Sequence, residues 1–194
     1  MAKILFCKNK NFNSEFTNLL KKRDDDDREI ERKVDSIIEN VKKKSDQALI
    51  DLTKKFDKFS VSKVSDLVVS QKEIEKSFKS VSSKVMSSLR KAIFRVKSYH
   101  RKQLPKNNFY KDKKGVLLGG IWNPIDAVGL YVPGGKAAYP SSLIMNAVPA
   151  IVAGVKRIVV TVPVTKGDVN PLVLACLKIL GIKEVYKIGG AQAI

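Results

Sequence analysis

Apolar residues recur at helical spacing through the early part of the chain, which predicts amphipathic helices there. Two stripes show this spacing: Ile30, Val34, Ile37, Ile38 and Val41, then Ala48, Leu49, Leu52 and Phe56. A residue able to cap a helix, Ser45 or Asp46, stands between them. We expect both stripes to face a hydrophobic core.

Two more helices are predicted before residue 114. Ser70 and Glu73 form an S-x-x-E capping box, which opens a helix carrying Ile74, Phe78 and Val81. A longer helix is expected from about Ser83 to Gln103. Its apolar stripe consists of Val85, Leu89, Ile93 and Val96.

The pattern changes after Gly115, where short β-branched runs alternate with helical segments. The expected strands are Val116–Ile121, Ala127–Val132, Arg157–Val162 and Glu184–Ile188, with a turn at Trp122–Asp126. The expected helices are Ser141–Ala153, bent at Pro149, and a helix that Asn170-Pro171 opens and Gly181 closes. Alternation of strand and helix indicates an α/β fold, a parallel sheet with right-handed crossovers.

Glycine and proline mark a boundary within the chain. All 11 glycines, and every proline except Pro105, follow residue 114. We therefore expect a helical N-terminal region over 1–114 and an α/β domain over 115–194.

The composition fits a globular protein, with 44% apolar residues among 194. No apolar run approaches the roughly 20 residues that span a bilayer, and the patch at Ile4–Cys7 is too short for a secretory leader. Cys7 and Cys176 form no C-x-x-C pair, so we expect free thiols in a reducing compartment. These features favour a cytoplasmic protein without a membrane partner.

The net charge of +18 raises the question of nucleic-acid binding. Residues 1–114 carry 30 Lys and Arg against 16 Asp and Glu, whereas residues 115–194 carry 7 against 3. Only 7 of the 37 basic residues are arginine, the residue best suited to bidentate contacts with bases or phosphates. We expect the lysines to form solvated helix faces, with no nucleic-acid partner.

Two other features could carry chemistry, but each has a simpler interpretation. His100 is the single histidine, and it lies in a basic helical stretch. A surface or capping role is favoured over a ligand or a base. The acids Asp24–Asp27 could attract a hard cation, although four consecutive acids beside a helix are more often solvated.

The segment from Val128 to Val155 has the layout of a site. A buried strand ends at Pro133-Gly134-Gly135, and Pro140-Ser141-Ser142 then opens a helix, whose free N–H groups favour an anion. A second glycine pair, Gly189-Gly190, follows the last strand. In open parallel sheets ligands bind at the carboxyl ends of the strands, so both pairs could line one crevice. Neither pair matches G-x-G-x-x-G, so a nucleotide or phosphate site and simple tight turns both remain open.

Two strings resemble signature segments of the histidinol dehydrogenase family. They are VGLYVPGGKAAYPSSLIMNAVPAIVAGV and GGAQAI. The upstream strings SDQALIDLTKKFDKF and YHRKQLP are similar to that family's N-terminal helical region. The resemblance runs from about Val34 to Ile194, and its YVPGG and GGAQA elements are long enough to be specific.

The resemblance implies a cytosolic, zinc-dependent homodimer that oxidises L-histidinol to L-histidine through the aldehyde, with two NAD⁺. Its NAD-holding domain is an incomplete Rossmann-like unit, which residues 115–194 would begin. The tyrosine of YVPGG and the glutamine of GGAQA contact NAD in that family, which implies this role for Tyr131 and Gln192. Gly134 and Gly135 would line the same site, and Ser141 matches a serine near the histidinol site.

The family's zinc ligands and its Glu-His acid–base pair follow GGAQA, so the resemblance implies that none lies in these 194 residues. We therefore expect an N-terminal fragment that is inactive alone, and that exposes surfaces normally covered by the remainder of the enzyme. The alternative is a non-catalytic NAD-binding or interaction module.

Overall fold

The computed structural model describes residues 4–134, 139–164 and 166–194, without the side chains of residues 22–27. The chain forms two compact units, Met1–Ala48 and Leu49–Ile194. The division falls within the first turn of a helix, α2 (Asp46–Phe56).

The first unit consists mainly of one long helix, α1 (Phe12–Lys44). The helix begins well before the predicted apolar stripe, and the acids 24–27 lie inside it instead of beside it. Lys42, Lys43 and Lys44 in its last turn oppose the negative end of the helix dipole. The stripe is not a buried core as expected, since Ile30 is 57% exposed and Ile38 is 39% exposed. A single helix offers its own apolar face no partner within the unit.

The second predicted stripe is buried only in part. Helix α2 begins at Asp46, directly after Ser45, whose φ of 47° ends α1. Ala48 and Leu52 are buried, together with the polar side chain of Thr53, but Phe56 at the end of the stripe is 52% exposed. The spacing thus predicted the helix and two of its buried positions, and was wrong for Phe56.

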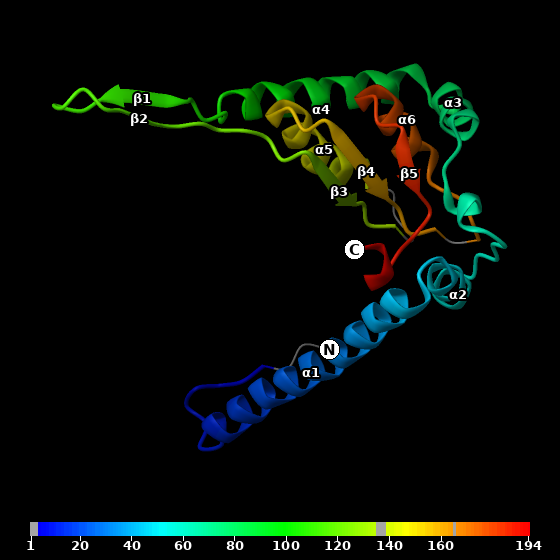
Figure 1. Ribbon diagram of the computed structural model, residues 1–194. Coiled ribbons are helices and arrows are strands. Elements are labelled where there is room, and N and C mark those ends of the chain that lie inside the picture. The colour runs from blue at the N-terminus through cyan, green and yellow to red at the C-terminus, as the bar shows by residue number, and fades with distance from the viewer. Residues whose placement is uncertain (1–3, 135–138, 165) are drawn as a thin grey trace. The chain divides into compact units, whose positions relative to one another are not determined.

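The second unit is built on a parallel three-stranded sheet, as the sequence predicts. The strands are β3 (Ala127–Tyr131), β4 (Arg157–Thr161) and β5 (Glu184–Tyr186), in the order β3-β4-β5. Leu130 pairs with Val160, which pairs with Val185. Helices α5 (Pro140–Ala153) and α6 (Pro171–Leu180) connect the strands and lie on one side of the sheet (Figure 1). This architecture confirms the α/β fold with helices followed by an incomplete Rossmann-like parallel sheet.

Local sequence explains where α5 and α6 begin and end. The Asn170 side chain accepts a hydrogen bond of 2.9 Å from the Leu172 N–H, and Pro171 occupies the first helical turn. Gly154 and Gly181 end the two helices with φ values of 88° and 74°, which a side chain would strain. Pro149 is accommodated inside α5.

Two further helices form an outer layer over α5 and α6. Helix α3 (Gln71–Ser80) packs on α6, and α4 (Ser83–Arg101) packs on α5. Ser70 caps α3 by accepting a 3.2 Å hydrogen bond from the Glu73 N–H. Glu73 makes no return bond; its carboxylate instead pairs with Lys187 at 3.0 Å. The main hydrophobic core lies between these layers and includes Ile74, Leu89, Leu143, Val160, Leu174 and Leu177.

The segment before α3 covers the outer edge of β5. A short 3₁₀ helix, η1 (Val64–Leu67), leads into a stretch where the Val69 N–H donates to the Val185 oxygen at 2.9 Å. The Lys187 N–H donates to the Leu67 oxygen at 2.7 Å. Residues 67–69 therefore satisfy backbone groups that an edge strand would leave unpaired.

One face of the sheet is open along β3. Along β3, Val128 and Leu130 turn toward the helices and are half-buried, whereas Ala127, Gly129 and Tyr131 are exposed. A Cβ added at Gly129 would meet no atom within 4 Å. Parallel sheets are normally covered on both faces, so this open face distinguishes the unit from a complete doubly wound fold.

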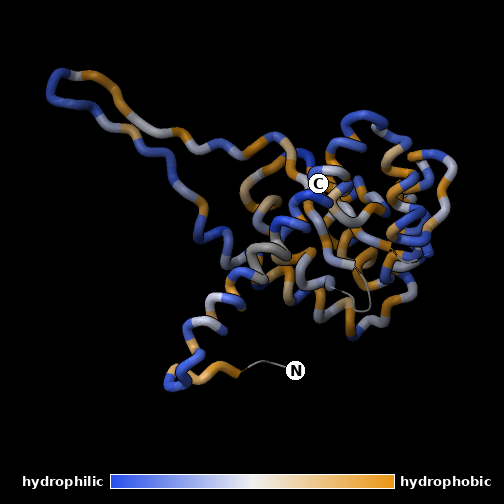
Figure 2. The backbone as a smooth tube through the Cα atoms, turned by 90° about the horizontal axis from the view of Figure 1, so that it is seen from below, coloured by the Kyte–Doolittle hydropathy of each residue, from blue (hydrophilic) through white to orange (hydrophobic). Residues whose placement is uncertain are grey.

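A hairpin that the sequence predicts only in part projects from the second unit (Figure 1). Strand β2 (Leu117–Gly120) lies within the predicted strand, but it pairs antiparallel with β1 (Asn108–Lys111), which was not anticipated. The side chain of Asp112 closes the turn by accepting from the Lys114 and Val116 N–H groups at 2.8 and 2.9 Å. Both strands are exposed throughout, and Figure 2 shows hydrophobic stretches behind the hydrophilic tip.

Within the described ranges, no helix combines the length and the apolar character that crossing a bilayer requires.

Candidate functional site

The loops after β3, β4 and β5 meet at the carboxyl edge of the sheet. Gly134 follows β3 and Gly189 follows β5, and both lie against Pro163, which follows β4. A Cβ at Gly134 would collide with the Pro163 backbone oxygen, and one at Gly189 would come within 2.6 Å of the Pro163 Cβ. The two glycine loops that the sequence predicts at one site therefore share one neighbour.

Tyr131 joins these loops through its hydroxyl group. It is the last residue of β3, and its hydroxyl accepts a hydrogen bond of 3.3 Å from the Gly190 N–H. Gly190 has a φ of 66°, a conformation that suits glycine. Tyr131 remains 36% exposed.

Gln192 brings an unsatisfied amide to the same loop. It lies in a short 3₁₀ helix, η2 (Ala191–Ala193), and is 8% exposed. Neither Oε1 nor Nε2 has a hydrogen-bond partner among the described residues. A Cβ at Gly190 would come within 2.7 Å of Oε1, so the amide lies against that glycine. A buried amide without partners costs free energy, and a ligand could recover that cost.

The structure brings together three of the five residues predicted for binding. Tyr131, Gln192 and Gly134 all border the loop after β5 or its neighbour Pro163. Gly135 lies outside the described residues. Ser141 lies in the first turn of α5, and none of the described hydrogen bonds links it to Tyr131 or Gln192.

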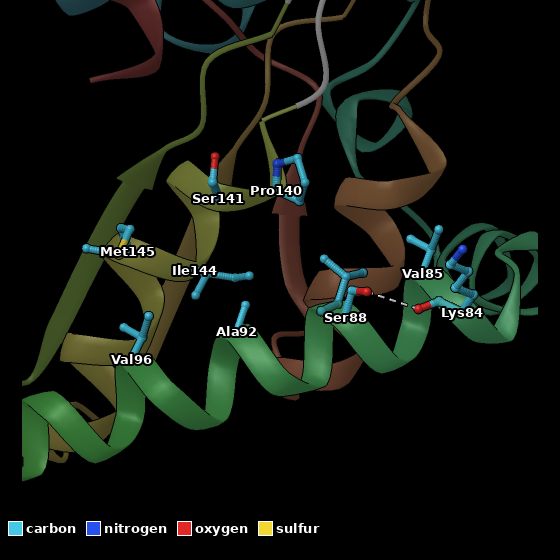
Figure 3. Close-up of a pocket in the computed structure, with 10 residues that line it drawn as sticks. Lys84, Val85, Ser88, Ala92, Val96, Pro140, Ser141, Ile144 and Met145 are labelled. Atoms are coloured by element: carbon cyan, nitrogen blue, oxygen red, sulfur yellow. Dashed lines mark hydrogen bonds between the residues drawn. The ribbon is translucent and has the colours of Figure 1, made fainter.

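Ser141 instead borders an apolar groove between α4 and α5. The groove has a volume of about 460 Å³, and Val85, Ala92, Val96 and Ile144 are among the residues that line it. Figure 3 shows Ser141 and Pro140 at one end of the groove, with the Ser141 hydroxyl pointing away from α4. Another hollow, of about 490 Å³, includes Arg157 and Glu184, which begin β4 and β5. It is therefore at the opposite edge of the sheet from the glycine loops.

One residue beside this site was missed by the sequence reasoning. Asp57 follows α2, and its carboxyl lies near the backbone of Gly189. Burial raises the pKa of this carboxyl above its usual value, and the nearby Gly189 backbone opposes that shift. The only signal in the sequence is an acid directly after an apolar helical stripe.

Two ion pairs hold helix α3, one of them beside the loop after β5. Lys187 Nζ lies 3.0 Å from the Glu73 carboxylate and 5.9 Å from the centre of the Phe59 ring. Lys178 of α6 pairs with Glu75 of α3 at 2.8 Å. These pairs tie α3 to the sheet and to α6.

The described residues do not fit a zinc site. Nowhere in the described part of the chain do three His, Cys, Asp or Glu residues gather closely enough to bind a metal ion. The His100 ring packs edge-on against Tyr99 near the end of α4, and its Nε2 atom is buried without a partner. A lone imidazole nitrogen does not make a zinc site, which needs three or four ligands.

The comparisons with known proteins agree on one family. A sequence model described as histidinol dehydrogenase matches residues 20–194. The chain is 45% identical over 183 residues to a histidinol dehydrogenase of Gluconobacter oxydans, covering 94% of this chain and 42% of that protein. It is 47% identical over 166 residues to the enzyme of Neisseria gonorrhoeae, covering 86% of this chain and 39% of that protein. The chain thus spans about two fifths of the length of these relatives.

A solved structure extends the similarity to three dimensions. The crystal structure of histidinol dehydrogenase from Elizabethkingia anophelis matches with a TM-score of 0.79 and 33% sequence identity. The match covers 84% of this chain and 37% of that one. A family match over most of the sequence and a shared fold lead to one conclusion: this chain belongs to the histidinol dehydrogenase family.

Proposed function

We propose that this chain supplies the NAD-binding part of an oxidoreductase of histidine biosynthesis. The complete protein would oxidise L-histidinol to L-histidine through the aldehyde, using two NAD⁺. Family membership supports the reaction class, and the loops at the carboxyl edge of the sheet support the nucleotide site. Because the chain spans 42% of its relative from Gluconobacter oxydans, this activity is proposed for the complete protein.

One observation carries the nucleotide assignment: the buried amide of Gln192 has no partner and lies beside the Tyr131–Gly190 hydrogen bond. An amide can donate to and accept from a nucleotide at once. The Tyr131 ring offers an exposed aromatic surface next to it. The lack of side chains at Gly134 and Gly189 lets the backbone approach a ligand closely.

In this proposal the chain's own residues bind and orient the nucleotide. NAD⁺, when bound, supplies the acceptor for a hydride. Gln192 would fix the orientation of the nucleotide through its amide, and Tyr131 would limit its movement on one side. The described residues do not fit the zinc ion that the resemblance implies.

Three further features of the complete protein belong to the same proposal. Ser141 would lie near the substrate, as the resemblance implies; it stands in the first turn of α5. The protein would act as a homodimer in the cytoplasm. The exposed hairpin and the open sheet face supply apolar surface that association could cover.

The nucleotide assignment is tested by Gln192→Met, which keeps the side-chain length and removes the amide. We expect the dissociation constant for NAD⁺, measured by calorimetry, to rise about tenfold, the usual scale for a lost amide contact to a ligand. The melting temperature should rise, because the unsatisfied amide no longer costs free energy. Unchanged NAD⁺ affinity would contradict the assignment.

Thr53→Val is the matched control. The Thr53 hydroxyl is also buried without a partner in the described structure, and valine has the same shape. This variant should gain stability in the same way and bind NAD⁺ as the original chain does. If both variants lost NAD⁺ affinity, the cause would be a general disturbance of the fold and not the loss of a contact between Gln192 and the nucleotide.

The alternative function is a non-catalytic NAD-binding or interaction module. It rests on the same loops at the carboxyl edge of the sheet, which could bind NAD⁺ without catalysis. The two functions differ in the complete protein, which should produce NADH from L-histidinol only if it is an enzyme. Absorbance of NADH, measured with and without a zinc chelator, separates them.

A further inference from the structure

One proline lies between the two glycine loops of the candidate site. Pro163 directly follows the last hydrogen bond between the β4 and β5 segments, in which the Val162 N–H donates to the Tyr186 oxygen at 2.9 Å. Because proline has no N–H, it cannot continue this ladder. Beyond this point Pro163 therefore meets its neighbours by packing: its ring lies against Gly189, and its backbone oxygen lies against Gly134.

These two glycines are not required by their backbone conformation. Neither Gly134 nor Gly189 has a positive φ, whereas Gly190 has a φ of 66°. What excludes a side chain is Pro163, since a Cβ at Gly134 would collide with its backbone oxygen. A Cβ at Gly189 would come within 2.6 Å of the Pro163 Cβ and within 3.0 Å of its Cγ. Non-bonded carbon atoms pack best at about 3.5–4.0 Å, so a methyl group at either glycine would push its loop away from the proline.

The same two loops carry the candidate contacts to a ligand. Tyr131 stands three residues before Gly134, and its hydroxyl accepts from the Gly190 N–H at 3.3 Å. A Cβ at Gly190 would come within 2.7 Å of the Gln192 Oε1 atom, so the amide lies against the loop after β5. Movement of either loop would therefore change the distance between the hydroxyl and the amide.

We infer that Pro163 is a positioning residue, which acts as a spacer between the loops at Gly134 and Gly189. Its ring and its backbone oxygen set the separation between the Tyr131 hydroxyl and the Gln192 amide. This inference rests on the proposed nucleotide site and adds to it a residue that needs no contact with the nucleotide. Direct packing suits this task, because close-packed atoms transmit a displacement instead of absorbing it.

The test is steric compensation in the full 194-residue chain. Gly189→Ala should displace its loop from the Pro163 ring and accelerate hydrogen exchange of the Gly190 N–H, measured by nuclear magnetic resonance without nucleotide. The dissociation constant for NAD⁺, measured by calorimetry, should rise about tenfold, as for a lost hydrogen bond to a ligand. Pro163→Gly removes the Cβ and Cγ atoms that the new methyl group would meet. The double variant should therefore recover most of the slow exchange and of the NAD⁺ affinity that Gly189→Ala loses.

Gly134→Ala is the matched comparison. Its methyl group would collide with the backbone oxygen of Pro163, which every substitution at that position retains. Pro163→Gly should therefore not compensate Gly134→Ala. Gly120→Ala is the neutral control, because Gly120 has no positive φ and a Cβ there would meet no atom within 4 Å. It should leave the exchange of Gly190 and the NAD⁺ affinity unchanged.

Pro163→Gly alone creates no collision, so it decides the question if Gly189→Ala does not fold. Without the spacer, exchange of the Gly190 N–H should be faster and NAD⁺ should bind more weakly. Unchanged exchange in either single variant would overturn the inference, and so would equal compensation of Gly134→Ala and Gly189→Ala. Faster exchange with unchanged NAD⁺ affinity would also overturn it, since the separation of the loops would then not matter for the ligand.

Failure of this inference can be distinguished from failure of the proposed function. If the original chain binds no NAD⁺, the proposed function fails in this chain. The exchange rates of the single and double variants still decide whether Pro163 sets the position of the loop after β5.

Discussion

At the scale of single residues, the two thiols occupy opposite environments. Cys176 lies in α6 and is 0% exposed, and burial raises its pKa to about 12. Cys7 is exposed. Because the thiolate is the nucleophilic form, the raised pKa and the burial both make Cys176 unreactive.

Iodoacetamide at pH 8 should therefore alkylate Cys7 in the native chain and leave Cys176 unmodified. Mass spectrometry of the digested protein measures the modification at each site. Unfolding in guanidinium before alkylation should make both thiols react at similar rates. Rapid native alkylation of Cys176 would contradict its placement in the core.

Residues of the candidate site differ in how far the sequence could indicate them. Gly134 is predictable, because a glycine directly after a buried strand marks a turn where a ligand can approach. Tyr131 and Gln192 are candidates only through the resemblance to a family. Asp57 escaped prediction altogether, since only the folded chain brings it near Gly189, far away in the sequence.

At the scale of elements, helix termini are set by short-range hydrogen bonds. Ser70 and Ser82 precede α3 and α4 and have similar extended backbones. The Ser70 side chain accepts from the Glu73 N–H, whereas the Ser82 side chain makes no cap hydrogen bond. Comparing the two serines therefore measures how much a side-chain cap contributes to the free energy of unfolding.

Ser70→Ala should lower the free energy of unfolding by about 1 kcal/mol, the usual cost of a lost side-chain cap. Ser82→Ala should lower the free energy of unfolding by only a few tenths of the Ser70→Ala loss, because no cap hydrogen bond is lost. Urea denaturation followed by circular dichroism measures both values. Equal losses in the two variants would show that the Ser70 bond contributes nothing specific.

The predicted elements succeed where their signals are local. The helices of the second unit and its three parallel strands follow from spacing, caps and turn residues. The pairing of β1 with β2 was missed, because Asn108–Lys111 has no alternation of apolar and polar residues. Its four residues are all exposed, so no buried face left a pattern in the sequence.

At the scale of the whole molecule, the two units differ in how much they bury. Ala48, at the boundary, is the only buried residue among the described ones of Met1–Ala48. Leu49–Ile194 contains the hydrophobic core. A helix without buried side chains opens at low free energy, which makes its backbone available to proteases.

Limited trypsin digestion should therefore cut first at Lys42–Lys44 and at the hairpin tip, Lys113–Lys114. Cuts within α3, α4 and β4 should follow much later, because their backbones are held by the core. Mass spectrometry of the early products identifies the cleavage sites, and digestion in urea should abolish the order. First cuts inside α4 would contradict the arrangement described for the second unit.

The predicted division into residues 1–114 and 115–194 stays a prediction of domain organisation. It rests on the change in glycine and proline content near Gly115. The packing of α3 and α4, from before that point, on α6 and α5 is a fact that composition does not express. Composition reports the type of local structure and carries little information about which segments pack together.

The sequence by itself determined the elements, most of their termini, the α/β class and the family, because each depends on neighbouring residues or on long matching segments. The tertiary structure alone decided that α1 would leave Ile30 and Ile38 exposed. It decided too that residues 67–69 would cover β5, and that Gly134 and Gly189 would share Pro163. It also decided that the Gln192 amide would be buried without a partner. These features arise from contacts between segments far apart in the chain, where packing and burial, not local propensity, set the free energy.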